Sequence, residues 1–367
     1  MTAINHIPWG KPDYWGNEER YVLEAVRSSW ISHGPFVDRL EAQFAQYCAI
    51  ENAVATSNGT TALHLAYIAL GIQPGDEIIV PGFAFMAAAN VALRVHAVPV
   101  FADVDRRTWC LDASDVERQI SPRTRAIVPV HTYGNVCDMN SIGHLAAQRG
   151  IPVLEDAAES FGSSYCGAMS GTLGALGCFS LHATKTVTSG EGGMVVTASA
   201  ETAESMRLYR SHGVKRTRYW HDVAGHNFRL TNVQAALGCA QIEQIDRIRR
   251  ERKRMYAAYL RHLEDAPGVR LQEITAGVDP LPWVVAVELD PQAFPQGRDA
   301  VIEQLKAVHI ETRPGFYTPT QLRHLYSAHD IGASDEISRS VLALPSFATL
   351  TNEEIEYVCG QLWKLRR

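Results

Sequence analysis

Between about residue 50 and residue 200, the chain alternates short apolar runs with segments of helical spacing. Continuous apolar runs separated by helices are typical of parallel strands buried on both faces. We therefore expect an α/β domain whose ligands bind at the carboxyl ends of the strands. The expected strands lie at 76–83, 98–105, 124–131 and 151–156, and the expected helices at 60–71, 84–97 and 139–150.

A long helical pattern over 232–266 is expected to link this domain to a second one. Since 367 residues exceed most single cores, we expect a large domain over 1–245 and a small C-terminal α+β domain over 246–367. The linking helix carries a basic run at 247–254. This run is either an anion-binding patch or a solvated helix face, and interspersed acidic residues favour the solvated face.

Composition and charge exclude several classes of function. The formal charge of −6 provides no electrostatic footprint for nucleic acid or for an anionic membrane surface. The sequence contains no secretory leader pattern and no apolar stretch of about 18 to 20 residues, so we expect no membrane association. Seven widely spaced cysteines without a CxxC pair are typical of reduced thiols in the cytoplasm, with no disulfide framework and no metal site.

Small polar residues at 57–61 open a predicted helix that follows an apolar run. Ser57, Gly59 and Thr60 leave backbone N–H groups free there, and the helix dipole favours an anion such as a phosphate. An ordinary helix cap with a turn glycine explains the same residues. The segment alone does not decide between these interpretations.

Acidic residues cluster where the 151–156 strand ends. Asp156 closes the strand, with Glu155 before it and Glu159 just after. A buried carboxylate needs a partner, and a protonated ring nitrogen of a cofactor would be one. The alternative is an aspartate that caps a helix.

Lys185 follows Asp156 by 29 residues, between an apolar run and the glycine-rich GEGGM segment. A lone lysine is usually a surface charge, but a partly desolvated lysine becomes nucleophilic. Ser180, five residues earlier, is placed to donate to a phosphate. Asn227 and Arg229 precede a helix, where they are either ligands or polar caps.

Seven segments of the chain resemble the DegT/DnrJ/EryC1/StrS sugar aminotransferase family. The resemblance covers essentially the whole chain and implies a fold type I aminotransferase, with a mixed, mostly parallel sheet in the large domain. It also implies pyridoxal 5'-phosphate as cofactor and a homodimer with shared active sites. The matching segments are 28–66, 74–92, 129–139, 153–160, 179–197, 227–238 and 343–358.

The resemblance assigns roles residue by residue. Lys185 stands where the family has its Schiff-base lysine, and Asp156 where a carboxylate pairs with the pyridine nitrogen. Relatives that act as dehydratases carry histidine at the lysine position, so Lys185 favours transamination. The other implied cofactor contacts are Glu159 beside the ring, Phe85 stacked on it, Ser57, Gly59, Thr60 and Ser180 at the phosphate, and Asn227 reaching the phosphate from the partner subunit.

The segments 6–12, 218–236 and 310–317 resemble members that aminate the C4 ketone of a GDP-linked 4-keto-6-deoxy sugar, with L-glutamate as donor. Departures within 180–184 and 313–326 leave the exact sugar, nucleotide and carbon open. Arg229 or Arg313 would hold the glutamate carboxylate or a diphosphate. His182 either packs behind the cofactor or contacts substrate. The candidate substrate residues are Ser32, His33, His182, Tyr219, Trp220, Arg229, Arg313, Phe316 and Tyr317.

Two other functions stay open at this point. One keeps the cofactor and changes the ketone to another cyclic ketone or a higher sugar acid. The other is a cofactor-binding regulator without turnover, which the absence of a basic helix-turn-helix segment disfavours.

Overall fold

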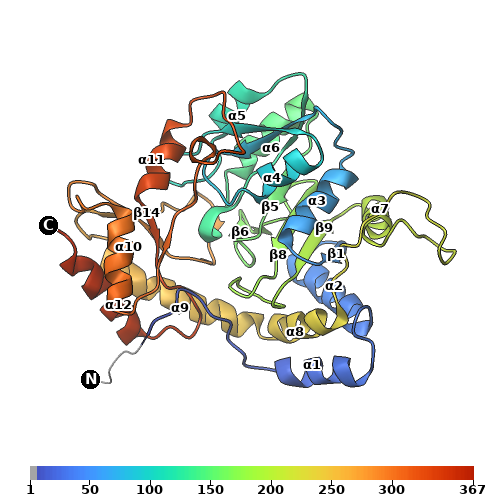
Figure 1. The fold of residues 1–367 in the computed structure, drawn as a ribbon, viewed down its shortest axis with the longest axis horizontal. Coiled ribbons are helices and arrows are strands. Elements are labelled where there is room, and N and C mark those ends of the chain that lie inside the picture. The colour runs from blue at the N-terminus through green and yellow to red at the C-terminus, as the bar shows by residue number, and fades with distance from the viewer. Residues whose placement is uncertain (1–5) are drawn as a thin grey trace.

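The computed structural model describes residues 6–367, and its core is a twisted sheet wrapped by helices (Figure 1). Two strand groups, ordered β1-β9-β8-β5 and β3-β2-β4, make up this sheet. Parallel bridges from Ile127 to Val153 and from Val130 to Asp156 join them between β4 and β5. The strands are β1 (Asn52–Thr56), β2 (Glu77–Pro81), β3 (Val98–Ala102), β4 (Thr124–Ile127), β5 (Leu154–Asp156), β8 (Leu176–Ser180) and β9 (Gly193–Thr197).

Every neighbouring pair in this sheet is parallel except the two that involve β9. This strand runs antiparallel to β1 on one side and to β8 on the other. The sheet is therefore mixed and mostly parallel, which confirms the expected fold class. Because the remaining strands share one direction, their carboxyl ends meet at one edge.

Helices cover both faces of the sheet. Successive strand residues alternate between two cores: Ile78 and Val80 pack on one face, whereas Ile79 packs on the other. The first face is covered by α3 (Gly59–Ala69), α4 (Ala87–Arg94) and α7 (Ala200–Arg210). The second is covered by α1 (Glu18–Arg27), α2 (Pro35–Cys48), α5 (Ala113–Gln119), α6 (Met139–Arg149) and α8 (Asn232–Glu243). Of the described helices, none combines the length and apolarity needed to cross a bilayer.

The C-terminal part has its own antiparallel sheet, ordered β10-β12-β14-β13, and its own core. Ile7 packs into this core and forms a parallel bridge with Ile310, so the start of the described chain belongs to the C-terminal part. The elements here are α9 (Ile245–Leu263), β10 (Val269–Leu271), β12 (Ala286–Leu289), α10 (Arg298–Ala307), β13 (Arg313–Pro314), α11 (Gly332–Ser340), β14 (Val341–Ala343) and α12 (Asn352–Lys364). Smaller elements are β6 (Ser164–Tyr165), β7 (Ala168–Met169), β11 (Val278–Asp279) and the 3₁₀ turns η1 (Thr132–Gly134) and η2 (Pro319–Gln321).

The expected long helix over 232–266 is two helices in the structure. A break at Gln244 separates α8 from α9, which continues from beside the large sheet to the C-terminal part (Figure 1). Packing crosses the proposed boundary in both directions. Ile7, from the proposed large domain, packs in the C-terminal core, whereas Ile248, from the proposed small domain, packs in the core beside the large sheet. The division into 1–245 and 246–367 stays a prediction.

Candidate active site

The strand ends place most of the predicted cofactor residues at one edge of the sheet. Asp156 is the last residue of β5, and Ser180 is the last residue of β8. Lys185 lies five residues beyond β8, and Phe85 follows β2. Ser57 follows β1. The shared direction of these strands is the physical reason that residues about 130 positions apart in the chain gather here.

The Lys185 side chain is largely buried, with 13% of its surface exposed. Its Nζ lies 3.9 Å from Glu159 Oε1 and 3.3 Å from the centroid of the Trp283 ring. Burial lowers the pKa of Lys185 below its usual value, while the charges of Glu159 and Asp156 oppose that change. The amine therefore sits between an aromatic face and two carboxyl groups.

Glu159 is 3% exposed and is fixed by a backbone donor. Its Oε2 accepts the N–H of Tyr133 at 2.9 Å, which leaves Oε1 facing Lys185. Tyr133 has a φ of +61°, a left-handed conformation that is rare outside glycine and that turns its N–H toward Glu159. Burial raises the pKa of Glu159 to about 7, against the lowering effect of Lys185.

Asp156 is 4% exposed at the end of β5. Among the described residues, its carboxylate accepts one hydrogen bond, from the N–H of Ala158 at 3.2 Å. Burial raises the pKa of Asp156, while this hydrogen bond and the charge of Lys185 lower it. A buried carboxylate whose second oxygen accepts no hydrogen bond from the described residues is suited to a cationic partner such as a protonated ring nitrogen.

Glu155, beside Asp156, has a structural role. Its carboxylate is fully buried and accepts hydrogen bonds from His131 Nε2 at 2.8 Å and from the N–H groups of Gly171, Leu173 and Gly174. It therefore fastens the 171–174 loop to the sheet. The acidic cluster seen in the sequence thus separates into one carboxylate that is satisfied internally and two at the site.

The amino end of α3 faces Ser180. Asn58 caps this helix by accepting the N–H of Thr61 at 2.8 Å, which leaves the first-turn N–H groups beyond it free. A Cβ on Gly59 would lie 3.0 Å from Ser180 Cβ, closer than such atoms normally approach. The glycine therefore allows the helix end and Ser180 to form one cradle, with a chemistry that fits a phosphate.

Four aromatic rings form one wall of the site, and of these only Phe316 was predicted from the sequence. Trp283 donates from Nε1 to the carbonyl of Thr184 at 2.8 Å, and Trp9 packs edge-on against it at 5.8 Å. Tyr133 stacks on Phe316 with centroids 5.1 Å apart. In the sequence Trp283 only begins an apolar run, so no local pattern marked it.

Four of the predicted contacts lie close to this wall. Phe85 is 63% exposed and packs edge-on against Phe316 at 6.3 Å, so its ring is open to a ligand. His182 belongs to the Lys185 turn, because its carbonyl accepts the Lys185 N–H at 2.9 Å, and it is exposed rather than packed. Arg313 lies over the Trp9 ring at 5.7 Å and pairs with Glu311. Tyr317 follows Phe316 and is half exposed.

A second group of predicted residues is not brought to Lys185 within one chain. Among residues 6–367, none of them forms a hydrogen bond, ion pair or ring contact with Lys185, Asp156 or Glu159. The 214–222 loop projects beyond α7 at the edge of the molecule (Figure 1). Arg229 donates to Asn227 and contacts His212 instead of reaching the site. The members of this group are Ser32, His33, Tyr219, Trp220, Asn227 and Arg229, and Asn227, Tyr219 and Trp220 are exposed.

A desolvated lysine beside two buried carboxyl groups, opposite a helix end that can hold phosphate, defines a fold type I pyridoxal-phosphate enzyme. The comparisons with known proteins agree with this class. The model of the DegT/DnrJ/EryC1/StrS aminotransferase family matches residues 13–363, and the chain belongs to that family. The expected aminotransferase class and its pyridoxal-phosphate dependence are confirmed.

Individual relatives match along nearly their whole length. GDP-perosamine synthase of Caulobacter vibrioides is 40% identical, with 99% of both chains covered. GDP-perosamine synthase of Escherichia coli O157:H7 is 38% identical, with 98% of both covered. The aminotransferase TlmJ of Streptoalloteichus hindustanus has a similar structure, with a TM-score of 0.92, 28% identity and 98% coverage of both chains.

Proposed function

We propose that this protein transfers the amino group of L-glutamate to the C4 ketone of a GDP-linked 4-keto-6-deoxy sugar of the mannose series. The observation that carries the aminotransferase chemistry is the position of Lys185, whose amine is desolvated next to Glu159 and Asp156. The GDP-linked substrate is supported by the names of the two GDP-perosamine synthases that the chain resembles throughout.

The residues present fit pyridoxal phosphate. Ser57, Gly59, Thr60 and Ser180 would bind its phosphate, Asp156 its ring nitrogen, and Phe85 one face of its ring. When bound, the cofactor supplies an electron sink that stabilises negative charge at the carbon losing or gaining a proton. Asp156 supports that chemistry by holding a positive charge on the ring nitrogen.

The proton steps belong to the chain itself. The Lys185 Nζ, neutral once released, would take the α-proton from the donor and return a proton to the sugar carbon. A lowered pKa suits both tasks, because a larger share of the amine is then neutral and able to accept a proton. Glu159 holds the amine on this side of the site, and Trp283 keeps water away from it.

The donor carboxylate and the nucleotide diphosphate need cationic contacts. Arg313 lies near the Trp9 and Trp283 wall and is the candidate within one chain. Phe316, Tyr317 and His182 would border the sugar. The second group of predicted residues would reach the site of a second copy in a homodimer that shares its active sites. This group consists of Ser32, His33, Tyr219, Trp220, Asn227 and Arg229. We place this dimer in the cytoplasm.

The direct test supplies purified protein with pyridoxal phosphate, L-glutamate and GDP-4-keto-6-deoxymannose. The expected result is equimolar 2-oxoglutarate and GDP-amino sugar, measured by mass spectrometry. The same enzyme with the dTDP-linked ketone is the matched substrate control. Lys185→Ala should abolish turnover.

Three outcomes separate the hypotheses. Equal rates with GDP-linked and dTDP-linked ketones would contradict the nucleotide assignment. Turnover only with an unlinked cyclic ketone would favour the alternative substrate class. Binding of pyridoxal phosphate without 2-oxoglutarate formation on any ketone would contradict the aminotransferase activity.

A further inference from the structure

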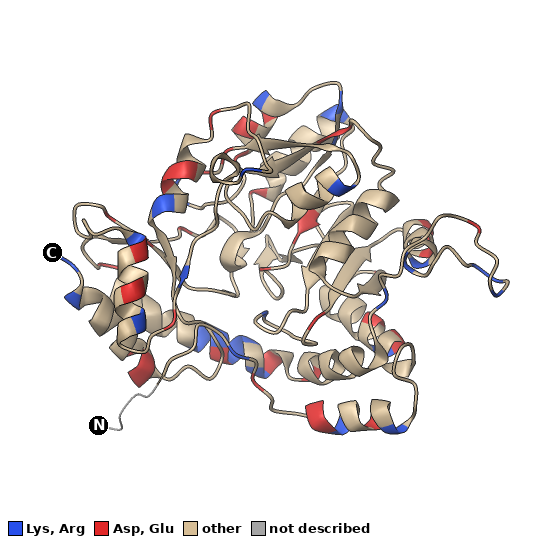
Figure 2. Ribbon diagram, in the orientation of Figure 1, with Lys and Arg blue, Asp and Glu red and all other residues tan. Residues whose placement is uncertain are grey.

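Arg252 is the inward-facing member of the basic run on α9. The other cations of this run, which colours α9 blue in Figure 2, are exposed or half-buried, and several pair with carboxylates. Lys253 bonds Asp279 at 2.7 Å and Arg254 bonds Glu251 at 2.9 Å. Arg252 is 4% exposed and has no ion pair within residues 6–367. The run is thus a solvated face with one exception.

The Arg252 guanidinium donates hydrogen bonds to backbone carbonyl groups. Its Nη1 donates to Trp283 O at 3.0 Å and to Pro282 O at 3.3 Å, while its Nε is buried without a partner. Burial lowers the pKa of Arg252 to about 10, opposed by the charge of Asp13. A buried charge without a counter-ion is costly, so its position calls for a function.

Trp283 connects Arg252 to the catalytic edge. Its carbonyl receives Arg252, its N–H donates to the carbonyl of Tyr133 at 3.1 Å, and its indole N–H donates to Thr184. Its ring is the surface on which the Lys185 amine lies. The contact path therefore runs from Arg252 through one residue to Nζ.

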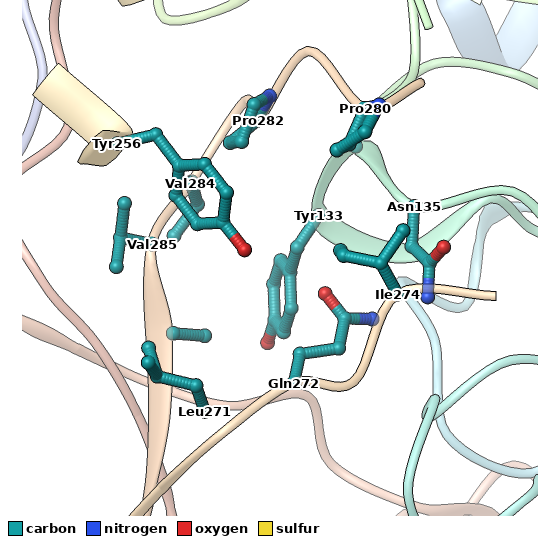
Figure 3. Close-up of a pocket in the computed structure, with 12 residues that line it drawn as sticks. Tyr133, Asn135, Tyr256, Leu271, Gln272, Ile274, Pro280, Pro282, Val284 and Val285 are labelled. Atoms are coloured by element: carbon teal, nitrogen blue, oxygen red, sulfur yellow. The ribbon is translucent and has the colours of Figure 1, made fainter. Parts of the chain in front are cut away.

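The packing behind this path leaves little freedom. Pro282, Tyr133 and Tyr256 line a cavity of about 10 Å³, which has room for about one water molecule (Figure 3). In the same view Tyr133 and Tyr256 converge on the space below Pro282. Loss of the Arg252 contacts would let the 282–283 backbone shift. Any such shift would also disturb the packing of Tyr133 and Tyr256.

We propose that Arg252 is a positioning residue for Lys185: it holds the Trp283 backbone so that the indole forms the wall for the free amine, and it places an unpaired positive charge behind that wall. The inference rests on the proposed role of Lys185. The charged groups that face Lys185 are Glu159 and Asp156, which favour the ammonium, and Arg252, which opposes them.

The test measures the amine itself in the cofactor-free protein. Competitive acetylation over pH about 7 to 11, read by mass spectrometry, gives the titration midpoint of Lys185, with exposed Lys306 as internal reference. Arg252→Met should raise the midpoint by about 0.5 to 1 pH unit, since a nearby positive charge is removed. Arg252→Lys should restore most of the wild-type value.

The matched control is Lys253→Met, which removes a charge from the next residue of the same helix without touching Trp283. A midpoint shift in Arg252→Met no larger than in this control would overturn the charge part of the proposal. Thermal unfolding of each variant separates a loss of fold from a local change.

A second pair of variants tests the wall independently, and it serves if Arg252→Met fails to fold. Trp283→Leu should raise the high-pH labelling rate of Lys185 at least about threefold, because the amine becomes accessible, while Trp283→Phe keeps a ring and changes it less. An unchanged rate in Trp283→Leu would overturn the positioning role. These readouts need neither cofactor nor sugar, so they stand apart from failure of the proposed transamination.

Discussion

Lys185 Nζ and Glu159 Oε1 face each other across 3.9 Å in a site where both side chains are largely withdrawn from water. Burial pushes the pKa of the amine down and the pKa of the carboxyl up, so the two values approach each other. The charged pair and the neutral pair are therefore closer in free energy than they would be in water. Such a pair is typical of acid–base chemistry near neutral pH.

Glu159→Gln should lower the pKa of Lys185 further, because it removes the nearest negative charge. The acetylation midpoint of the cofactor-free protein should move down by about 0.5 to 1 pH unit, opposite to Arg252→Met. Glu191→Gln is the control. Glu191 is an exposed residue of the loop that carries Lys185, and its Oε1 lies 3.9 Å from His182 Nε2. An upward or absent shift would show that the carboxyl does not act on the amine.

The proton of Glu159 has a defined pH window. Its folded pKa of about 7 lies above its ordinary value of 4.5, so the unfolded chain releases this proton first as pH rises. The contribution of Glu159 to the free energy of unfolding therefore declines between about pH 4.5 and pH 7. Infrared difference spectra should show a buried carboxylic acid that ionises near pH 7 and is missing in Glu159→Gln. If the carboxylic-acid band were already lost by pH 5 as the pH is raised, the assignment would be wrong.

Asp156→Asn should retain pyridoxal phosphate and lose catalysis. The amide keeps the size of the side chain but cannot stabilise a positive ring nitrogen, so we expect a fall in kcat of about 100-fold or more. Cofactor content, measured by absorbance after desalting, should stay near wild type. A variant with nearly normal kcat would remove Asp156 from the mechanism.

Gly59→Ala should weaken the phosphate cradle. The new Cβ would press on Ser180 at 3.0 Å, and we expect the Kd for pyridoxal phosphate to rise by about tenfold, equivalent to about 1.4 kcal/mol. Gly143→Ala is the matched control, because Gly143 lies within α6 with open space around its Cβ position. That control should keep its affinity and gain about 0.5 to 1 kcal/mol of stability, because alanine has a higher helix propensity than glycine. Equal effects of both substitutions on cofactor binding would contradict the cradle.

Mixing two inactive variants tests whether active sites are shared between subunits. If Asn227 of one subunit serves the Lys185 site of the other, Lys185→Ala and Asn227→Ala chains each form dead homodimers. Hybrids formed by reversible unfolding should then recover about a quarter of wild-type activity, because half of the dimers are hybrids with one intact site. No recovery, with hybrids verified by native mass spectrometry, would place both residues in the same subunit's site.

The cluster of Lys185, Asp156 and Glu159 could be predicted because it depends on local patterns. Asp156 ends an apolar run, and parallel strands bring their carboxyl ends together whatever lies between them. Trp283 and Arg252 could not be found in this way. Their positions depend on how the C-terminal part packs against the sheet, and a buried arginine within a basic run has the same local sequence as an exposed one.

The break at Gln244 was missed for a related reason. The 232–266 segment has continuous helical spacing and no proline or glycine at the break, so pattern alone predicts one helix. Tertiary packing decides instead, since α8 must follow the large sheet and α9 must reach the C-terminal core. The left-handed backbone of Tyr133 was equally invisible, because nothing in its neighbours demands it.

The placement of Trp9 has a consequence for synthesis of the chain. Its carbonyl accepts the N–H of Ser346 and its ring packs edge-on against Trp283, so Trp9 finds these partners only after both later residues have been synthesised. While the ribosome is still adding the last third of the protein, the large sheet can form but the lysine has no aromatic wall. The Lys185 amine is therefore expected to stay open to solvent until this wall has been made, and a truncation that removes Trp283 should leave the amine exposed even where the sheet survives.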